Sequence, residues 1–166
     1  MKGILCSAVI FVAGLTAAPV LAETTSQTVY KYKHWEVEAV AFDDGSYACL
    51  AEVDDTTDSF TLWVYQDNTV KLQFYSTSWD FGEGDTADLQ IKIGNRSPWS
   101  LNAAELYQNS ILFDLPDSSQ GVNFIKEVAQ GSRLFLNTAS GEPVMEYSLA
   151  GSKASIAALG ECSDQL

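Results

Sequence analysis

Two neighbouring segments, SFTLWVYQ (59–66) and VKLQFYS (70–76), alternate in polarity with the two-residue period of a β-strand. The turn-forming residues Asp67-Asn68-Thr69 separate them, so the pair predicts a hairpin. Apolar side chains fall on both faces of the first segment: Phe60, Leu62 and Val64 on one, Trp63 and Tyr65 on the other. A sheet that is partly apolar on both faces fits a β-sandwich better than a sheet with one face in water.

The same pattern of short strands and turns runs through most of the remaining chain. Strands are also expected at 34–42, 47–53, 89–93, 104–108, 110–115, 132–138 and 143–149. Residues 23–33 are expected to be a polar leader and residues 78–88 a glycine-containing loop. The chain is therefore predicted to be mainly β, an antiparallel β-sandwich or open barrel of about eight to nine strands.

Two segments change to a helical period. Residues 118–131 have Ser118 or Ser119 as N-cap, apolar Val122, Ile125 and Val128 at three-residue spacing, and Gly131 as the stop. Residues 152–162 form the second helix, with Ser152 as N-cap and Ile156 and Leu159 on its inner side. Both predicted helices are short.

The first 22 residues have the composition of a secretory signal peptide. Lys2 is followed by the apolar run ILCSAVIFVAGLTAA and then by Pro19 and Val-Leu-Ala, which predicts cleavage after Ala22. The run is shorter than the roughly 18 to 20 apolar residues of a membrane span, and no later segment qualifies as one. We therefore expect a signal peptide at 1–22, one β-sandwich domain at 23–166, and a periplasmic or secreted location.

The chain is strongly acidic. It has 22 Asp and Glu residues against nine Lys and Arg residues, a net charge of −13, and removal of Lys2 with the signal peptide makes this −14. Nucleic acids and anionic lipid headgroups bind basic surfaces, so the charge argues against both as partners.

Two cysteines, Cys49 and Cys162, remain after cleavage removes Cys6. In an exported chain an even pair predicts a disulfide, with free structural thiols as the alternative. Because the bond would close most of the domain, chain entropy gives an upper contribution of about 5 kcal/mol.

The segment GSRLFLNTASGEPVMEYSLAGSKASIAALGEC (131–162), together with Trp35, Val37 and the early Cys49, resembles the small exported alphaproteobacterial proteins grouped with the invasion-associated locus B family. The resemblance extends over most of the mature chain as a layout of elements. The sequence departs from that family in lacking a mid-chain cysteine pair and in having a cysteine at residue 162. The resemblance implies an envelope or secreted β-sandwich with no established catalytic residues.

The sequence contains few candidates for catalysis or metal binding. His34 is the only histidine and no G-x-S-x-G motif occurs, so no catalytic residues are assigned. Asp80, Glu83 and Asp85 on the glycine-containing loop are candidate calcium ligands, because clustered hard oxygens suit Ca²⁺, although the EF-hand spacing is missing. No other cofactor is expected.

Three aromatic residues fall in or beside loops instead of periodic strands: Trp79, Phe81 and Trp99. Loop aromatics next to carboxylates are typical of recognition surfaces, so these residues form a candidate recognition patch for a protein or glycan partner in the envelope or outside the cell.

These features favour a non-enzymatic exported binding or accessory protein, stabilised by a disulfide. The alternative is an inhibitor or immunity-type protein that blocks an enzyme with the acidic loop 80–88. A small hydrolase is a third interpretation, against which the single histidine argues.

Overall fold

The computed structural model describes residues 24–166, so the predicted signal peptide at 1–22 lies outside the described residues. Ten antiparallel strands form one sheet in the order β1-β2-β3-β4-β5-β8-β7-β6-β9-β10. The strands are β1 (Thr25–Tyr32), β2 (Trp35–Ala41), β3 (Tyr47–Asp54), β4 (Asp58–Tyr65), β5 (Val70–Ser76), β6 (Glu83–Ile93), β7 (Trp99–Tyr107), β8 (Ser110–Leu115), β9 (Arg133–Thr138) and β10 (Pro143–Ser148). The helices are α1 (Ser119–Gln130) and α2 (Ser152–Ser163).

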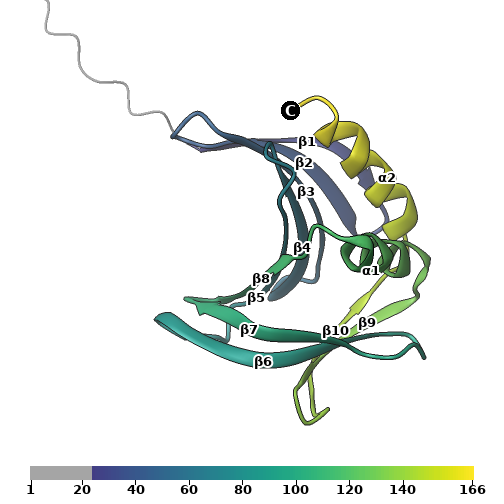
Figure 1. Cartoon of the computed structure of the whole chain (residues 1–166). Coiled ribbons are helices and arrows are strands. Elements are labelled where there is room, and N and C mark those ends of the chain that lie inside the picture. Colours follow the sequence, from purple (N-terminus) through teal and green to yellow (C-terminus); the bar gives the residue numbers. More distant parts are fainter. Residues whose placement is uncertain (1–23) are drawn as a thin grey trace, which may run out of the picture.

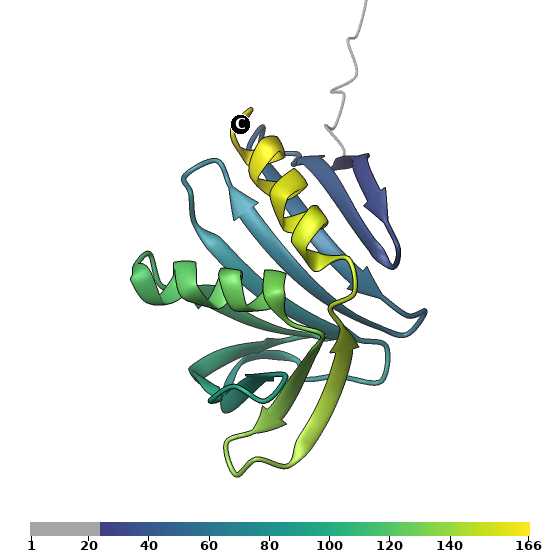
Figure 2. The ribbon, with the colours of Figure 1, turned by 90° about the vertical axis from the view of Figure 1, so that its right-hand side faces the viewer.

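The sheet is curled but not closed. Figure 1 shows an open arc that runs from β1 to β7 and β6, with both helices on its outside, and the sheet continues from β6 through β9 to β10 on the side of the helices. Figure 2, which looks from that side, shows α1 and α2 lying across the sheet. One face of the first five strands is therefore covered, and we call the opposite face, inside the arc, the uncovered face. The prediction of a mainly β chain, an antiparallel β-sandwich or open barrel, is confirmed, with ten strands in the described residues instead of eight or nine.

The alternation seen in the sequence places one set of apolar side chains under the helices. Trp35, Val53, Phe60, Phe74 and Ile111 are register partners across β2, β3, β4, β5 and β8, and each is at most 4% exposed. Tyr147 of β10 packs against this row, with its ring centroid 6.0 Å from that of Phe60 and 6.1 Å from that of Phe74. The last strand is thus held against the middle of the sheet by aromatic packing.

Three stretches expected to lie outside strands belong to the sheet: β1 at its edge, the first half of β6, and residues 99–103, the first half of β7, so Trp99 lies in a strand. Residues 25–32, expected as a polar leader, pair with β2 as the edge strand β1, and residues 83–88, expected as part of a loop, form the first half of β6. Both segments are mostly exposed, so they lack the apolar face that reveals a strand in the sequence. A mostly polar sequence is typical of strands at the edge of a sheet, where one side of the strand faces solvent.

Helix α1 begins and ends where the sequence predicts. The Ser118 side chain accepts a hydrogen bond from the N–H of Gln120, and Gly131 follows the last turn. The buried side is formed by Gly121, Phe124 and Val128, whereas Val122, one of the three apolar residues from which the helix was predicted, is 52% exposed.

The N-cap of α2 also differs from the prediction. It is Gly151, in the left-handed region at φ +112°, and Ser152 is the first helical residue. The Ser152 hydroxyl instead donates to the carbonyl of Val128 at the end of α1, 2.8 Å away. This serine joins the two helices in the core instead of capping its own helix. No helix within residues 24–166 is long and apolar enough to cross a membrane.

Burial raises the pKa of the Tyr147 hydroxyl above its ordinary value, with smaller contributions from Asp58, Asp55 and Glu52. In the unfolded chain Tyr147 loses its proton near pH 10, whereas the folded chain keeps it, so folding stability falls as the pH rises above about 10. Replacing Tyr147 with Phe removes this contribution. We expect Tyr147→Phe to lose less stability than the wild type between neutral pH and about pH 11, measured by urea unfolding. Equal losses in the two proteins would contradict this.

Candidate binding face

The uncovered face changes in character across the strands. One row of neighbouring residues across the strands, each paired in register with the next, consists of Glu38 on β2, Leu50, Trp63, Lys71 and Asp114 on β8. A parallel row runs from Asp54 through Ser59 and Tyr75 to Ser110, with Tyr107 of β7 beside it. Carboxylates thus gather at β2 and β3, and aromatic and polar side chains at β4, β5, β7 and β8.

An aromatic groove of about 410 Å³ lies over β4, β5 and β8. Its rings are half-buried or, for Tyr107, exposed. The ring of Trp63 lies 6.1 Å from that of Tyr65 at an interplanar angle of 15°, and Phe42 lies 6.3 Å from Tyr65 at 19°. The lining residues are Phe42, Trp63, Tyr65, Lys71, Gln73, Tyr75, Tyr107, Gln108, Asn109, Ser110 and Leu112.

Hydrogen bonds fix the orientation of Trp63 in this groove. Its indole Nε1–H donates to the Oε1 atom of Gln73 at 2.8 Å, and the Nε2 atom of Gln73 donates to the hydroxyl of Ser110 at 2.9 Å. A side chain held in place before binding loses little rotational freedom when a ligand arrives. The ring of Trp63 is therefore a preorganised contact surface.

An acidic hollow of about 360 Å³ adjoins the aromatic groove. Trp63, Gln73 and Tyr75 line both, so the two form one continuous surface. The other lining residues of the hollow are Glu52, Asp54, Thr56, Thr57, Asp58 and Ser59.

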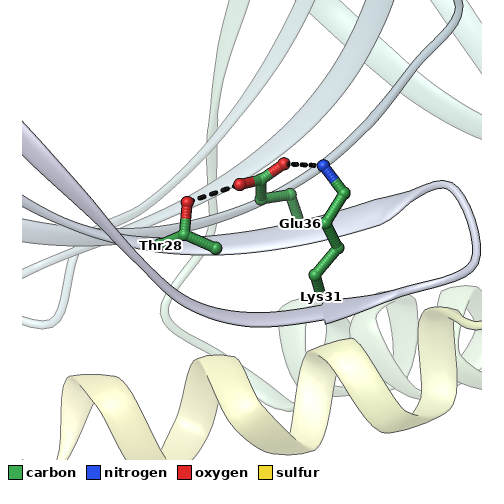
Figure 3. Close-up of polar contacts among 3 residues, drawn as sticks. All are labelled: Thr28, Lys31 and Glu36. Carbon is green, nitrogen blue, oxygen red and sulfur yellow. Dashed lines mark hydrogen bonds and ion pairs between the residues drawn. The ribbon is translucent and has the colours of Figure 1, made fainter.

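Some of the charges on this face are already paired. Figure 3 shows Glu36 accepting hydrogen bonds from Lys31 and Thr28, on the side of the β1–β2 hairpin away from α2, and the Lys31 hydrogen bond and charge, with the Thr28 hydroxyl, lower the pKa of Glu36. Lys71 pairs with Asp114 at 3.3 Å. None of the three ion pairs formed within residues 24–166 involves Glu38, Asp54 or Asp58. The β2–β3 side of the face is therefore negative.

The predicted disulfide is present. Cys49 of β3 and Cys162 of α2 are bonded, with their Cα atoms 6.1 Å apart across a sequence separation of 113 residues. Cys49 lies on the covered face, so the bond fastens α2 to the sheet and lies on the side opposite the aromatic groove.

The predicted recognition patch is arranged as two aromatic pairs. Trp79 and Phe81 lie with ring centroids 5.2 Å apart, while Trp99 packs edge-on against Phe124 of α1 and donates its Nε1–H to Glu127 at 2.9 Å. All three residues are half-buried against the core. The side chain of Asn109, which lines the aromatic groove, donates to the carbonyl of Trp79, so the loop that carries Trp79 supports the rim of the groove.

The calcium candidates do not converge. Within residues 24–166 no three or more His, Cys, Asp or Glu side chains are placed to hold a metal ion, so Asp80, Glu83 and Asp85 form no such group. Glu83 and Asp85 belong to strand β6, which limits the acidic loop proposed for inhibition to residues 80–82. His34 is exposed in the turn between β1 and β2.

Sequence reasoning missed the residues that line the groove. The sequence pattern places Trp63 and Tyr65 on the second apolar face of their strand, which predicts that they lie in a sandwich core. The polar residues on the same face could have identified these two residues as partly exposed, because Thr61, Lys71 and Gln73 lie next to them in the sheet. A buried face would not carry that many polar groups.

No protein family model matches the sequence, and no curated protein matches it. Among solved structures, the chain is similar to the crystal structure of invasion associated protein B from Bartonella henselae, with a TM-score of 0.53 over 84% of this chain and 99% of that chain. The two are alike in fold. At 13% sequence identity the likeness supports the layout-level resemblance inferred from the sequence and extends to no individual site residue.

Proposed function

We propose that this chain is a non-enzymatic, exported binding or accessory protein that binds a partner on its uncovered face. The observation that carries the proposal is the aromatic groove, in which Phe42, Trp63 and Tyr65 remain partly exposed on the side of the sheet that no helix covers. Large aromatic side chains that stay exposed do not contribute the stability that their burial would give the folded protein. Such groups are typical of binding surfaces, where a partner completes their burial.

Export is supported by the apolar N-terminal run that follows Lys2 and by the disulfide between Cys49 and Cys162, since disulfides persist in oxidising compartments. A non-enzymatic role is supported by the composition of the groove. Its lining offers aromatic rings, amides and hydroxyls for contact, while the single histidine lies in the β1–β2 turn. The resemblance to the invasion-associated locus B family implies an envelope or secreted setting, and the likeness in fold to invasion associated protein B supports that resemblance.

The proposal is tested by capturing partners from an envelope extract with tagged protein and comparing two variants. Trp63→Ala removes the central ring of the groove, and Val122→Ala trims an exposed apolar residue on α1 as the matched control. We expect Val122→Ala to retain the partners of the wild type and Trp63→Ala to lose at least about nine-tenths of them, because central aromatic residues dominate binding energy. Equal recovery by both variants would remove the groove from the proposed function.

A further inference from the structure

The position of the acidic hollow indicates what kind of partner the groove receives. We infer that the groove binds an extended, basic polypeptide segment of the partner, with one Lys or Arg side chain over Trp63 and neighbouring apolar side chains against Tyr65 and Phe42. This inference rests on the proposed function, and it names the class of ligand for the same face.

Trp63 is where the two halves of the surface meet. It lines both the aromatic groove and the acidic hollow, and its orientation is fixed by Gln73. A cation over an indole ring is attracted by the electrons of the ring face, and Trp is the best of the three aromatic side chains for this contact. Carboxylates on Glu52, Asp54 and Asp58 lie in the same hollow, so a cation bound there meets both kinds of attraction.

The rest of the groove suits the remainder of a peptide. The rings of Phe42 and Tyr65 provide apolar contact area for aliphatic or aromatic side chains. Gln108 and Asn109 in the β7–β8 turn are polar side chains of a kind that bonds the N–H and C=O groups of a bound backbone. Lys71 is the one cation in the lining, and its pairing with Asp114 reduces its repulsion of a basic ligand.

The charge of the protein favours a basic peptide over acidic peptides, anionic polysaccharides and neutral glycans as the ligand. The protein's net charge, −13 for the full chain and −14 without residues 1–22, repels acidic peptides and anionic polysaccharides, whereas it attracts a basic segment over a distance and speeds encounter. A neutral glycan would use the same rings and amides but would gain nothing from this long-range attraction. The basic segment is therefore the ligand that uses every part of the surface.

The direct test is a titration of ¹⁵N-tryptophan-labelled protein, followed by NMR of the indole N–H resonances. The probes are a hexapeptide that alternates arginine with leucine, the same peptide with glutamate in place of arginine, and cellohexaose. We expect the arginine peptide to shift the Trp63 resonance and leave that of the fully buried Trp35 unchanged, with affinity falling about tenfold or more as salt is raised from roughly 50 to 500 mM. The glutamate peptide should shift neither.

Paired charge variants distinguish the groove from general attraction to an acidic protein. Glu52→Gln with Asp54→Asn removes two charges from the hollow, and the amide of the new glutamine can still accept the hydrogen bond from Thr61. Glu142→Gln with Asp164→Asn removes two exposed charges that do not line it. We expect the first pair to weaken binding of the arginine peptide about tenfold and the second less than about twofold.

Each alternative result has a distinct meaning. Equal weakening by both variant pairs would overturn the inference, because binding would then follow net charge alone. A Trp63 shift with cellohexaose but not with the arginine peptide would also overturn it, yet would leave the proposed function standing with a glycan as ligand. The proposed function fails separately, if captured partners are indifferent to Trp63→Ala.

Discussion

The double variant Cys49→Ala with Cys162→Ala is expected to unfold about 4 to 5 kcal/mol more easily than the oxidised wild type. The disulfide closes a loop of 113 residues in sequence separation, and without it the unfolded chain regains the conformational freedom of that loop. Alanine is chosen because both cysteines are buried, so a serine hydroxyl would add a second cost of burying a polar group. Urea unfolding monitored by tryptophan fluorescence measures the difference.

The control for this variant is the wild-type protein with its disulfide reduced. Reduction removes the cross-link and keeps both sulfur atoms in the core, so the reduced wild type should unfold well below the oxidised wild type and at or slightly above the urea concentration of the double variant, which also loses the packing of the two sulfur atoms. If the oxidised wild type and the double variant have equal midpoints, the fastening of α2 to β3 contributes nothing to stability, and the predicted role of the disulfide is wrong.

The disulfide was also the site feature that the sequence predicted best. Only Cys49 and Cys162 lie outside the predicted signal peptide, so the prediction of their pairing needs no geometric information. Strands β2 to β5 were also predicted from local information alone, because their apolar residues alternate with the two-residue period of a strand.

The sequence failed where burial depends on distant parts of the chain. Strand β1 is exposed along almost its whole length and begins with four polar residues, so it is recognisable only by its register with β2. The N-cap of α2 is Gly151, whose positive φ and close approach to the carbonyl of Tyr32 and the ring of Trp35 would crowd a Cβ atom, so the position suits glycine. Neither contact is visible in the local sequence.

The aromatic groove was missed for a related reason. In strand β4 the alternation gives two faces that both carry rings, Phe60 on one and Trp63 and Tyr65 on the other. Which face is covered is decided by α2, which the disulfide fastens over the side of Cys49, more than a hundred residues away along the chain. The covered face supplies stability, and the uncovered face is left with partly exposed rings.

This difference predicts unequal effects of two aromatic substitutions in one strand. Phe60→Ala is expected to lower the free energy of unfolding by about 3 to 5 kcal/mol, since it empties a fully buried site among Trp35, Phe74 and Tyr147. Trp63→Ala removes a larger side chain but one that is only half-buried and makes one hydrogen bond, so the expected loss is about 1 to 2 kcal/mol. Urea unfolding of both variants gives the comparison.

Binding should change in the opposite order. Trp63→Ala is expected to weaken the arginine hexapeptide at least about tenfold, whereas Phe60→Ala, measured at a temperature where it is folded, should bind within about twofold of the wild type because Phe60 does not line the groove. If Trp63→Ala destabilises the protein as much as Phe60→Ala, its ring belongs to the core and the two faces of β4 are equivalent. If both variants bind like the wild type, Trp63 is not the centre of the binding face.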